Sequence, residues 1–106
     1  MSPRPIGLIT ARVLRAVQDG HRHGADIMTA TGHGGGTVYK VLRRLELRGH
    51  IAGHWEDARV AERERRPRRR YYRLTAEGEA ELQQAMSRAK APGGPSATAL
   101  GTEQVR

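Results

Sequence analysis

The sequence predicts a mainly helical domain that carries one small β-hairpin towards its C-terminal end. Three observations lead to this fold class. Three segments in the first half space their apolar residues as helices do, two short segments rich in β-forming residues flank a highly charged stretch, and one more helical segment follows. A chain of 106 residues has room for one domain with a small core.

The first two helices are expected within residues 6–19 and 23–31. In the first, apolar residues recur at helical spacing, at Ile6, Ile9, Val13 and Val17. Gly20 follows this segment as a plausible stop. The second segment is long enough for about two helical turns and ends at Gly32.

The third helix, expected over residues 37–48, has the most regular pattern in the chain. Its apolar positions follow the i, i+3, i+4, i+7 spacing of one helix face, at Val38, Val41, Leu42 and Leu45. A glycine-rich turn over residues 32–36 precedes it, and Gly49 follows where a left-handed residue commonly ends a helix. The positions expected to face outward include Thr37, Tyr39, Lys40, Arg43 and Arg44.

Residues 50–56 and 69–74 are expected to be two strands, because aromatic and β-branched residues suit a half-buried pleated surface. The charged stretch over residues 57–70 interrupts any packing pattern, so the predicted hairpin, called the wing here (residues 50–74), ends in a protruding loop. Thr75 is a good N-cap for a last helix that runs to about Lys90. This helix has a weak apolar stripe, formed by Leu82, Ala85 and Met86.

Charge indicates the partner. Nineteen Lys and Arg against eleven Asp and Glu give a formal net charge of +8, a balance that favours nucleic acid. A short helix, a glycine turn and a basic helix match a helix-turn-helix, whose later helix enters the major groove of DNA. We therefore expect DNA contacts from the third helix, nearest to the bases at its N-terminal end, by Thr37, Tyr39, Lys40, Arg43 and Arg44.

The wing is the second expected DNA contact. Arginines crowd the stretch from Ala58 to Thr75, at Arg59, Arg63, Arg65, Arg66, Arg68, Arg69, Arg70 and Arg73. The four around Pro67, namely Arg66, Arg68, Arg69 and Arg70, are expected on the DNA backbone or in the minor groove. Such contacts release counterions and give salt-sensitive affinity with little sequence preference. The alternative is a solvated charge run.

Several other classes of function are not expected. Without cysteine there can be no disulfide and no thiolate metal site. His50 and His54, four apart on a strand, would lie about 13 Å apart and could not share an ion, so we expect no metal and no cofactor. The chain shows no nucleophile elbow, P-loop or other catalytic motif, so we expect a non-enzyme. With no apolar run of ~20 residues and no secretory signal, we expect no membrane contact and a cytoplasmic location.

Three ordered motifs resemble the PadR family of transcriptional regulators. Residues 23–27, H-G-A-D-I, are similar to the family's H-G-Y-E-I. Residues 36–39, G-T-V-Y, followed by 42–46, L-R-R-L-E, look like its G-T-L-Y…L-R-R-L-E helix. Residues 66–78 look like its R-P-R-K-Y-Y-x-L-T-x-x-G segment. The resemblance covers about residues 6–88, and Gly34-Gly35 stand where relatives usually have Ser-Pro.

The resemblance implies a homodimeric winged helix-turn-helix repressor of double-stranded DNA, with an effector often bound near the dimer interface. The expected organisation is a DNA-binding domain over residues 1–74, a dimerisation helix over 75–90 with Leu82, Ala85 and Met86 at the interface, and a disordered tail over 91–106. Two alternatives stay open at this stage. They are a basic RNA- or ribosome-associated protein and a metal-sensing winged helix repressor.

Overall fold

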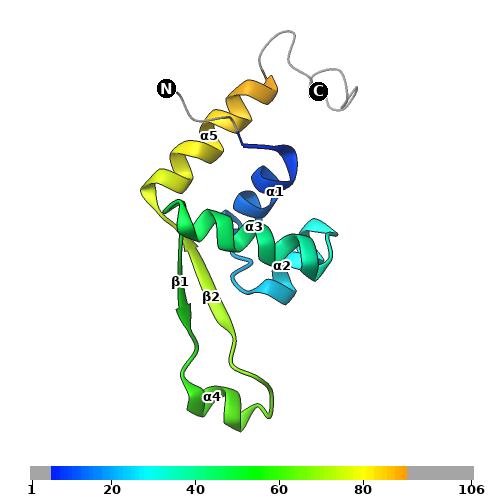
Figure 1. The fold of residues 1–106 in the computed structure, drawn as a ribbon, viewed down its shortest axis with the longest axis vertical. Helices are drawn as coiled ribbons and strands as arrows, with labels where there is room; N and C mark the ends of the chain where they lie inside the picture. The colour runs from blue at the N-terminus through cyan, green and yellow to red at the C-terminus, as the bar shows by residue number, and fades with distance from the viewer. Residues whose placement is uncertain (1–5, 91–106) are drawn as a thin grey trace.

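The expected fold class is confirmed by the computed structural model, which describes residues 6–90. Five helices and one antiparallel hairpin follow in the order α1 (Leu8–Gln18), α2 (Gly24–Thr31), α3 (Gly35–Leu47), β1 (Ile51–Trp55), α4 (Ala58–Arg63), β2 (Arg70–Leu74) and α5 (Ala76–Lys90). The wing extends away from the helical body, with α4 at its far end and α5 at the opposite end of the molecule (Figure 1). The tail expected over residues 91–106 lies outside the described residues.

The core forms around α1, which contacts α2, α3, α5 and β2. The predicted apolar stripe of α3 is fully buried in it, and α1 contributes the face that carries Val13, Leu14 and Val17. The first turn of α1 departs from the expected stripe, because Leu8 and Ile9 are 64% and 40% exposed. Leucine, valine and isoleucine side chains thus supply most of the burial that stabilises this small domain.

The wing is attached to the body along more than its base. β1 and β2 pair in antiparallel register from Ile51 opposite Leu74 to Trp55 opposite Arg70. The Tyr72 N–H also donates to the carbonyl oxygen of Arg22 at 2.8 Å, and an isolated bridge joins His23 to Tyr71. The segment before α2 therefore adds an isolated bridge and one backbone hydrogen bond beside β2, next to the two-stranded sheet.

The start of α5 is fixed against the turn between α3 and β1. The Thr75 hydroxyl accepts from the Gly78 N–H at 3.1 Å, as an N-cap does, and donates to the Gly49 carbonyl oxygen at 2.6 Å. The Thr75 N–H donates to the His50 carbonyl oxygen at 3.1 Å. A β-carbon at Gly78 would overlap that same oxygen, so only glycine allows this approach.

The stretch between the strands is not the irregular loop that the sequence suggested. Residues 58–63 form helix α4, and the Asp57 side chain caps it by accepting from the Arg59 N–H at 2.9 Å. Ala61 is buried on the inner side of α4. The chain then passes through Arg65, a non-glycine residue in the left-handed region with φ 55°, before it returns towards β2.

Candidate nucleic-acid interface

The outward face of α3 carries the side chains that were expected to reach DNA. Thr37, Tyr39, Lys40, Arg43 and Arg44 are all exposed, opposite the buried stripe. Lys40 and Arg44, with Thr37, line an open groove of about 480 Å³ between α3 and the first turn of α1. The N-terminal half of α3 therefore presents a mixture of hydroxyl and cationic groups to solvent.

Tyr39 has a second role, in packing. Its ring lies against the backbone of Gly24 at the start of α2, where a β-carbon would come within 2.6 Å of the ring atom Cε1. The side chain is still 52% exposed, so one part of the ring holds α2 against α3 while the rest faces solvent. Tyr39 stays a candidate for DNA contact, but its ring position depends on Gly24.

The arginines of the wing fall into two groups, which the sequence did not separate. Arg66 forms a paired contact with the buried carboxylate of Glu56, with its Nη1 at 2.6 Å and its Nη2 at 2.8 Å from the two oxygens. Arg70 donates to the carboxylate of Glu46 on α3 and lies 5.2 Å from the centre of the Trp55 ring. These two guanidinium groups are therefore engaged within the protein.

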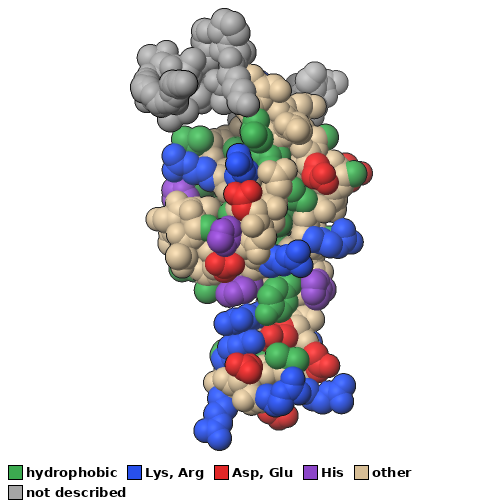
Figure 2. Space-filling model, turned by 180° about the vertical axis from the view of Figure 1, so that it is seen from behind, with side chains coloured by type: hydrophobic (Ala, Val, Ile, Leu, Met, Phe, Trp, Pro, Cys, Tyr) green, Lys and Arg blue, Asp and Glu red, His purple; other side chains and the backbone are tan. Residues whose placement is uncertain are grey.

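Other cationic groups of the wing point outwards. Arg59, Arg63, Arg65, Arg68 and Arg73 are exposed, and Arg69 is half-buried. Arg68 uses its Nε to donate to the Glu56 carbonyl oxygen at 2.8 Å, while Arg59 pairs with Asp57 at 3.5 Å. Figure 2 shows arginine side chains (blue) along the wing and around its tip, interspersed with acidic ones.

Glu46 and Glu56 are functional candidates that the sequence analysis missed. They lie 24 and 10 residues from their arginine partners, so a charge count along the 57–70 stretch alone does not include them. The hairpin register was the available signal. Pairing Trp55 with Arg70 brings Glu56 opposite Arg69, and the Glu56 N–H indeed donates to the Arg69 carbonyl oxygen at 2.8 Å.

The pKa of Glu56 in the wing and the pKa of His23, where the wing joins the body, are both shifted from their usual values. The hydrogen bond from Arg66 lowers the pKa of Glu56 from 4.5 to about 2, against a rise from desolvation, so the carboxylate stays ionised. Burial, followed by the charge of Arg69, lowers the pKa of His23 below 6.5. The His23 ring meets Tyr71 edge-on at 5.8 Å, where the wing joins the body.

The expected dimerisation residues differ in position, and one expectation needs correction. Leu82 is 1% exposed and belongs to the core of the single chain, so its side chain is not free to pack against a partner. Ala85 and Met86 are partly exposed on α5. The stripe counted from the sequence therefore faces mainly inwards, towards α1.

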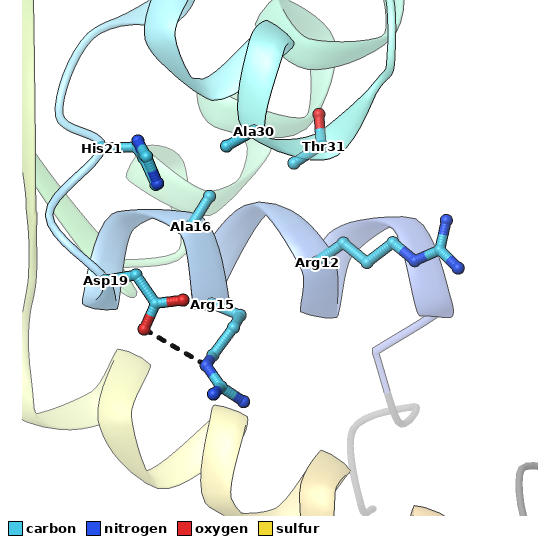
Figure 3. Close-up of a pocket in the computed structure, with 7 residues that line it drawn as sticks. All are labelled: Arg12, Arg15, Ala16, Asp19, His21, Ala30 and Thr31. Atoms are coloured by element: carbon cyan, nitrogen blue, oxygen red, sulfur yellow. Dashed lines mark hydrogen bonds and ion pairs between the residues drawn. The ribbon is translucent and has the colours of Figure 1, made fainter. Parts of the chain in front are cut away.

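A shallow pocket of about 370 Å³ lies between α1 and α2 (Figure 3). Arg12, Arg15 and Asp19 come from α1 and the residue after it, while His21 and Thr31 line the other side. Arg15 and Asp19 form an ion pair at 3.3 Å. Within residues 6–90, no three His, Asp or Glu side chains gather as metal ligands would, and no helix is long and apolar enough to cross a bilayer.

The helix-turn-helix core with its basic third helix and hairpin wing defines a winged helix transcription regulator. The chain belongs to the PadR-like family of transcriptional regulators, because the model of that family matches residues 13–84. This is a family of regulators and not of enzymes. No curated protein sequence matches the chain.

Solved structures share the fold. A PadR family transcription regulator from a hypervirulent Clostridium difficile is 23% identical with a TM-score of 0.66, over 76% of this chain and 85% of that one. Bordetella bronchiseptica BpsR, whose DNA binding is regulated by 6-hydroxynicotinic acid, is 23% identical with a TM-score of 0.61, over 77% and 53%. MepR of S. aureus in complex with DNA is 26% identical with a TM-score of 0.58, over 77% and 63%. The chain thus matches less than two thirds of the length of the last two.

Proposed function

We propose that this chain is a sequence-specific DNA-binding repressor, with α3 in the major groove and the wing on the DNA backbone or in the minor groove. The observation that carries the proposal is the exposed face of α3, where Thr37, Lys40 and Arg43 project from a buried apolar stripe in a PadR-like chain. An α-helix fits the major groove, and Lys and Arg suit guanine edges and phosphates. The structurally similar MepR has been solved in complex with DNA, which supports DNA as the partner of this fold.

Within this proposal, α3 and the wing have different tasks. Thr37, Tyr39, Lys40, Arg43 and Arg44 read or flank the bases, while Arg68 and Arg69 neutralise phosphates. The ion pairs of Arg66 and Arg70 favour a supporting role for these two arginines. Arg63 and Arg65 at the exposed tip join the phosphate contacts.

The proposed active form is a homodimer with two-fold symmetry, since a palindromic operator matches such a dimer. Ala85 and Met86 of α5, together with the exposed Leu8 and Ile9 of α1, supply the apolar surface for it. Sedimentation equilibrium at micromolar concentration tests this state. A strict monomer that still binds operator DNA tightly would contradict it.

The direct experiment is a selection of DNA duplexes from a random pool with the purified protein. We expect an enriched palindrome whose half-sites are centred about one helical turn, ~10 base pairs, apart. Competition with random duplex DNA and with structured RNA follows. Equal affinity for all three would reject sequence-specific regulation and favour the RNA-associated alternative.

A small acidic effector is the second part of the proposal. The α1–α2 pocket has the volume of a small-ligand site. It is lined by Arg12, by Arg15 in its ion pair with Asp19, and by His21, whose ring nitrogen lies 3.1 Å from Asp26. The regulation of BpsR by 6-hydroxynicotinic acid is the precedent among similar structures. A thermal-shift screen of small aromatic carboxylates, repeated with Arg12→Ala, tests the site. No stabilisation by any of them, or equal stabilisation of the variant, would count against it.

A further inference from the structure

Glu56 is the one charged residue with a buried side chain among the described residues, 7% exposed. It lies directly after β1, where the chain leaves the hairpin and enters α4. A buried carboxylate is costly unless other groups neutralise it and donate hydrogen bonds to it. The groups that donate hydrogen bonds to the Glu56 carboxylate therefore show which part of the chain this residue holds in place.

All the donors to the Glu56 carboxylate come from the returning side of the wing. Arg66 supplies the paired contact at 2.6 and 2.8 Å, the Arg69 N–H donates at 3.2 Å and the Tyr71 hydroxyl at 3.3 Å. The Nε of Arg68 adds a bond to the Glu56 carbonyl oxygen at 2.8 Å. We call Glu56 with these partners the Glu56 clamp. It closes the wing tip, residues 57–65, into a loop with fixed ends.

The wing tip has little of its own to keep it ordered. Six residues of α4 are too few for a stable isolated helix, and only Ala61 is buried there. Arg65 adopts a left-handed conformation, which is unfavourable for a residue with a β-carbon. The exposed side chains of Arg63 and Arg65 therefore keep their places only if the ends of the loop are fixed.

We propose that Glu56 is a positioning residue for DNA binding, and that its clamp holds the wing tip so that Arg63 and Arg65 meet DNA phosphates. The inference rests on the proposed function. It makes an acidic residue favourable for binding a polyanion, because a pre-ordered tip avoids the cost of immobilising long side chains at the moment of association. Simple charge counting gives the opposite sign, since removing an acid from the wing should strengthen DNA binding.

The test compares Glu56→Gln with Glu62→Gln, which removes the same charge from an exposed position on α4. We expect Glu56→Gln to bind the selected duplex about tenfold more weakly. The slope of log affinity against log salt should flatten by about 0.9 for each phosphate that the wing no longer neutralises. Glu62→Gln should bind equally well or more tightly. Arg66→Lys keeps the positive charge but loses the planar guanidinium, whose two nitrogens contact both carboxylate oxygens. This variant should behave as Glu56→Gln does.

Trp55, the only tryptophan of the chain, provides a readout that needs no DNA. It directly precedes Glu56 and lies beside Arg68 and Arg70, at 5.9 and 5.2 Å. Its fluorescence anisotropy should fall in Glu56→Gln and not in Glu62→Gln, while circular dichroism shows that the helical body remains folded.

Two results are decisive. If Glu56→Gln matches Glu62→Gln in anisotropy, affinity and salt slope, the proposal is overturned. If the wild-type protein does not prefer its selected duplex over random DNA, the proposed function fails. An unchanged anisotropy in Glu56→Gln would then reject the clamp independently, and a reduced one would support the clamp as a device that orders the wing.

Discussion

The ring of Tyr39 on α3 lies directly on the backbone of Gly24 at the start of α2, and leaves no space for a β-carbon there. The two residues belong to different motifs of the PadR resemblance, H-G-x-x-I and G-T-x-Y. Their contact brings the two motifs together where α2 packs against α3. The first motif supplies the glycine backbone and the second supplies the ring, and their contact fixes how the two helices of the helix-turn-helix pack together.

Gly24→Ala should lower the free energy of unfolding by about 1–3 kcal/mol, as overpacking of a close contact does. The loss should be smaller in the background of Tyr39→Ala, because the ring that the new methyl group meets is then absent. Urea unfolding of the two single variants and the double variant measures this coupling. Gly36→Ala, at a helical position with open space around it, is the control and should be neutral or slightly stabilising. Additive losses in the double variant would contradict the contact.

Lys40→Ala should weaken binding to the selected duplex by about 1–3 kcal/mol while changing binding to random DNA much less, if Lys40 contacts a base edge. Its exposed position in the first half of α3 is the reason for the expectation. Competition between the two duplexes measures the difference. Arg88→Ala removes one positive charge from an exposed position on α5 and serves as the control. Equal losses on both duplexes would reassign Lys40 to a phosphate contact.

Arg66→Ala should lower the midpoint of thermal unfolding, because it leaves the buried Glu56 carboxylate without its paired partner. Arg63→Ala, at an exposed position on the same wing, should leave the midpoint unchanged while flattening the salt dependence of DNA binding. Calorimetry and a salt titration separate the two effects. Identical behaviour of the two variants would show that the wing arginines are equivalent, as the sequence alone suggested.

Gly78→Ala should be among the more damaging single changes, with a loss of about 1–3 kcal/mol. The new β-carbon would lie 2.9 Å from the carbonyl carbon of His50 and overlap its oxygen, and backbone atoms yield less than a side chain does. Glu79→Ala, the exposed neighbour, should stay within about 0.5 kcal/mol of the wild-type protein. Urea unfolding compares the two, and a fully stable Gly78→Ala would mean that α5 can shift away from the α3–β1 turn without cost.

Acid should destabilise the protein through His23. Because folding holds the pKa of this residue below 6.5, the unfolded chain takes up a proton first as the pH falls through 6.5. The contribution of His23 to stability is therefore complete above that pH and declines below it. His23→Gln should weaken the pH dependence of the unfolding free energy between pH 7.5 and about pH 5.5. Urea unfolding at a series of pH values measures this, and an unchanged pH dependence in His23→Gln would contradict the role of His23.

The elements that could be predicted from sequence are those with local causes. The spacing of Val38, Val41, Leu42 and Leu45 fixes the face of α3, and Gly49 ends the helix with φ 80° as its position suggested. Thr75 caps α5 as expected. In each of these cases the deciding interactions lie within a few residues along the chain.

What escaped prediction depends on distant residues. Val60 and Ala61 are too few apolar positions to reveal α4, which also needs the Asp57 cap and the Glu56 clamp. Arg66 and Arg70 resembled free phosphate contacts because their carboxylate partners come from β1 and α3. Leu82 was assigned to an interface because a single helix stripe does not tell which neighbour covers it. In the structure, α5 packs on α1 of the same chain, and Leu82 lies in the core between them.

The backbone pairing of β2 with the segment before α2 has a mechanical consequence. Because Tyr72 is bonded to Arg22 and Tyr71 bridges to His23, the hairpin cannot swing freely about the α3–β1 turn. The distance between the tip of the wing and the N-terminal half of α3 is therefore held nearly constant. If DNA contacts both elements as proposed, it has to offer a matching distance between neighbouring grooves. We therefore expect the protein to discriminate by the pitch and groove width of a duplex, at base pairs that no side chain touches.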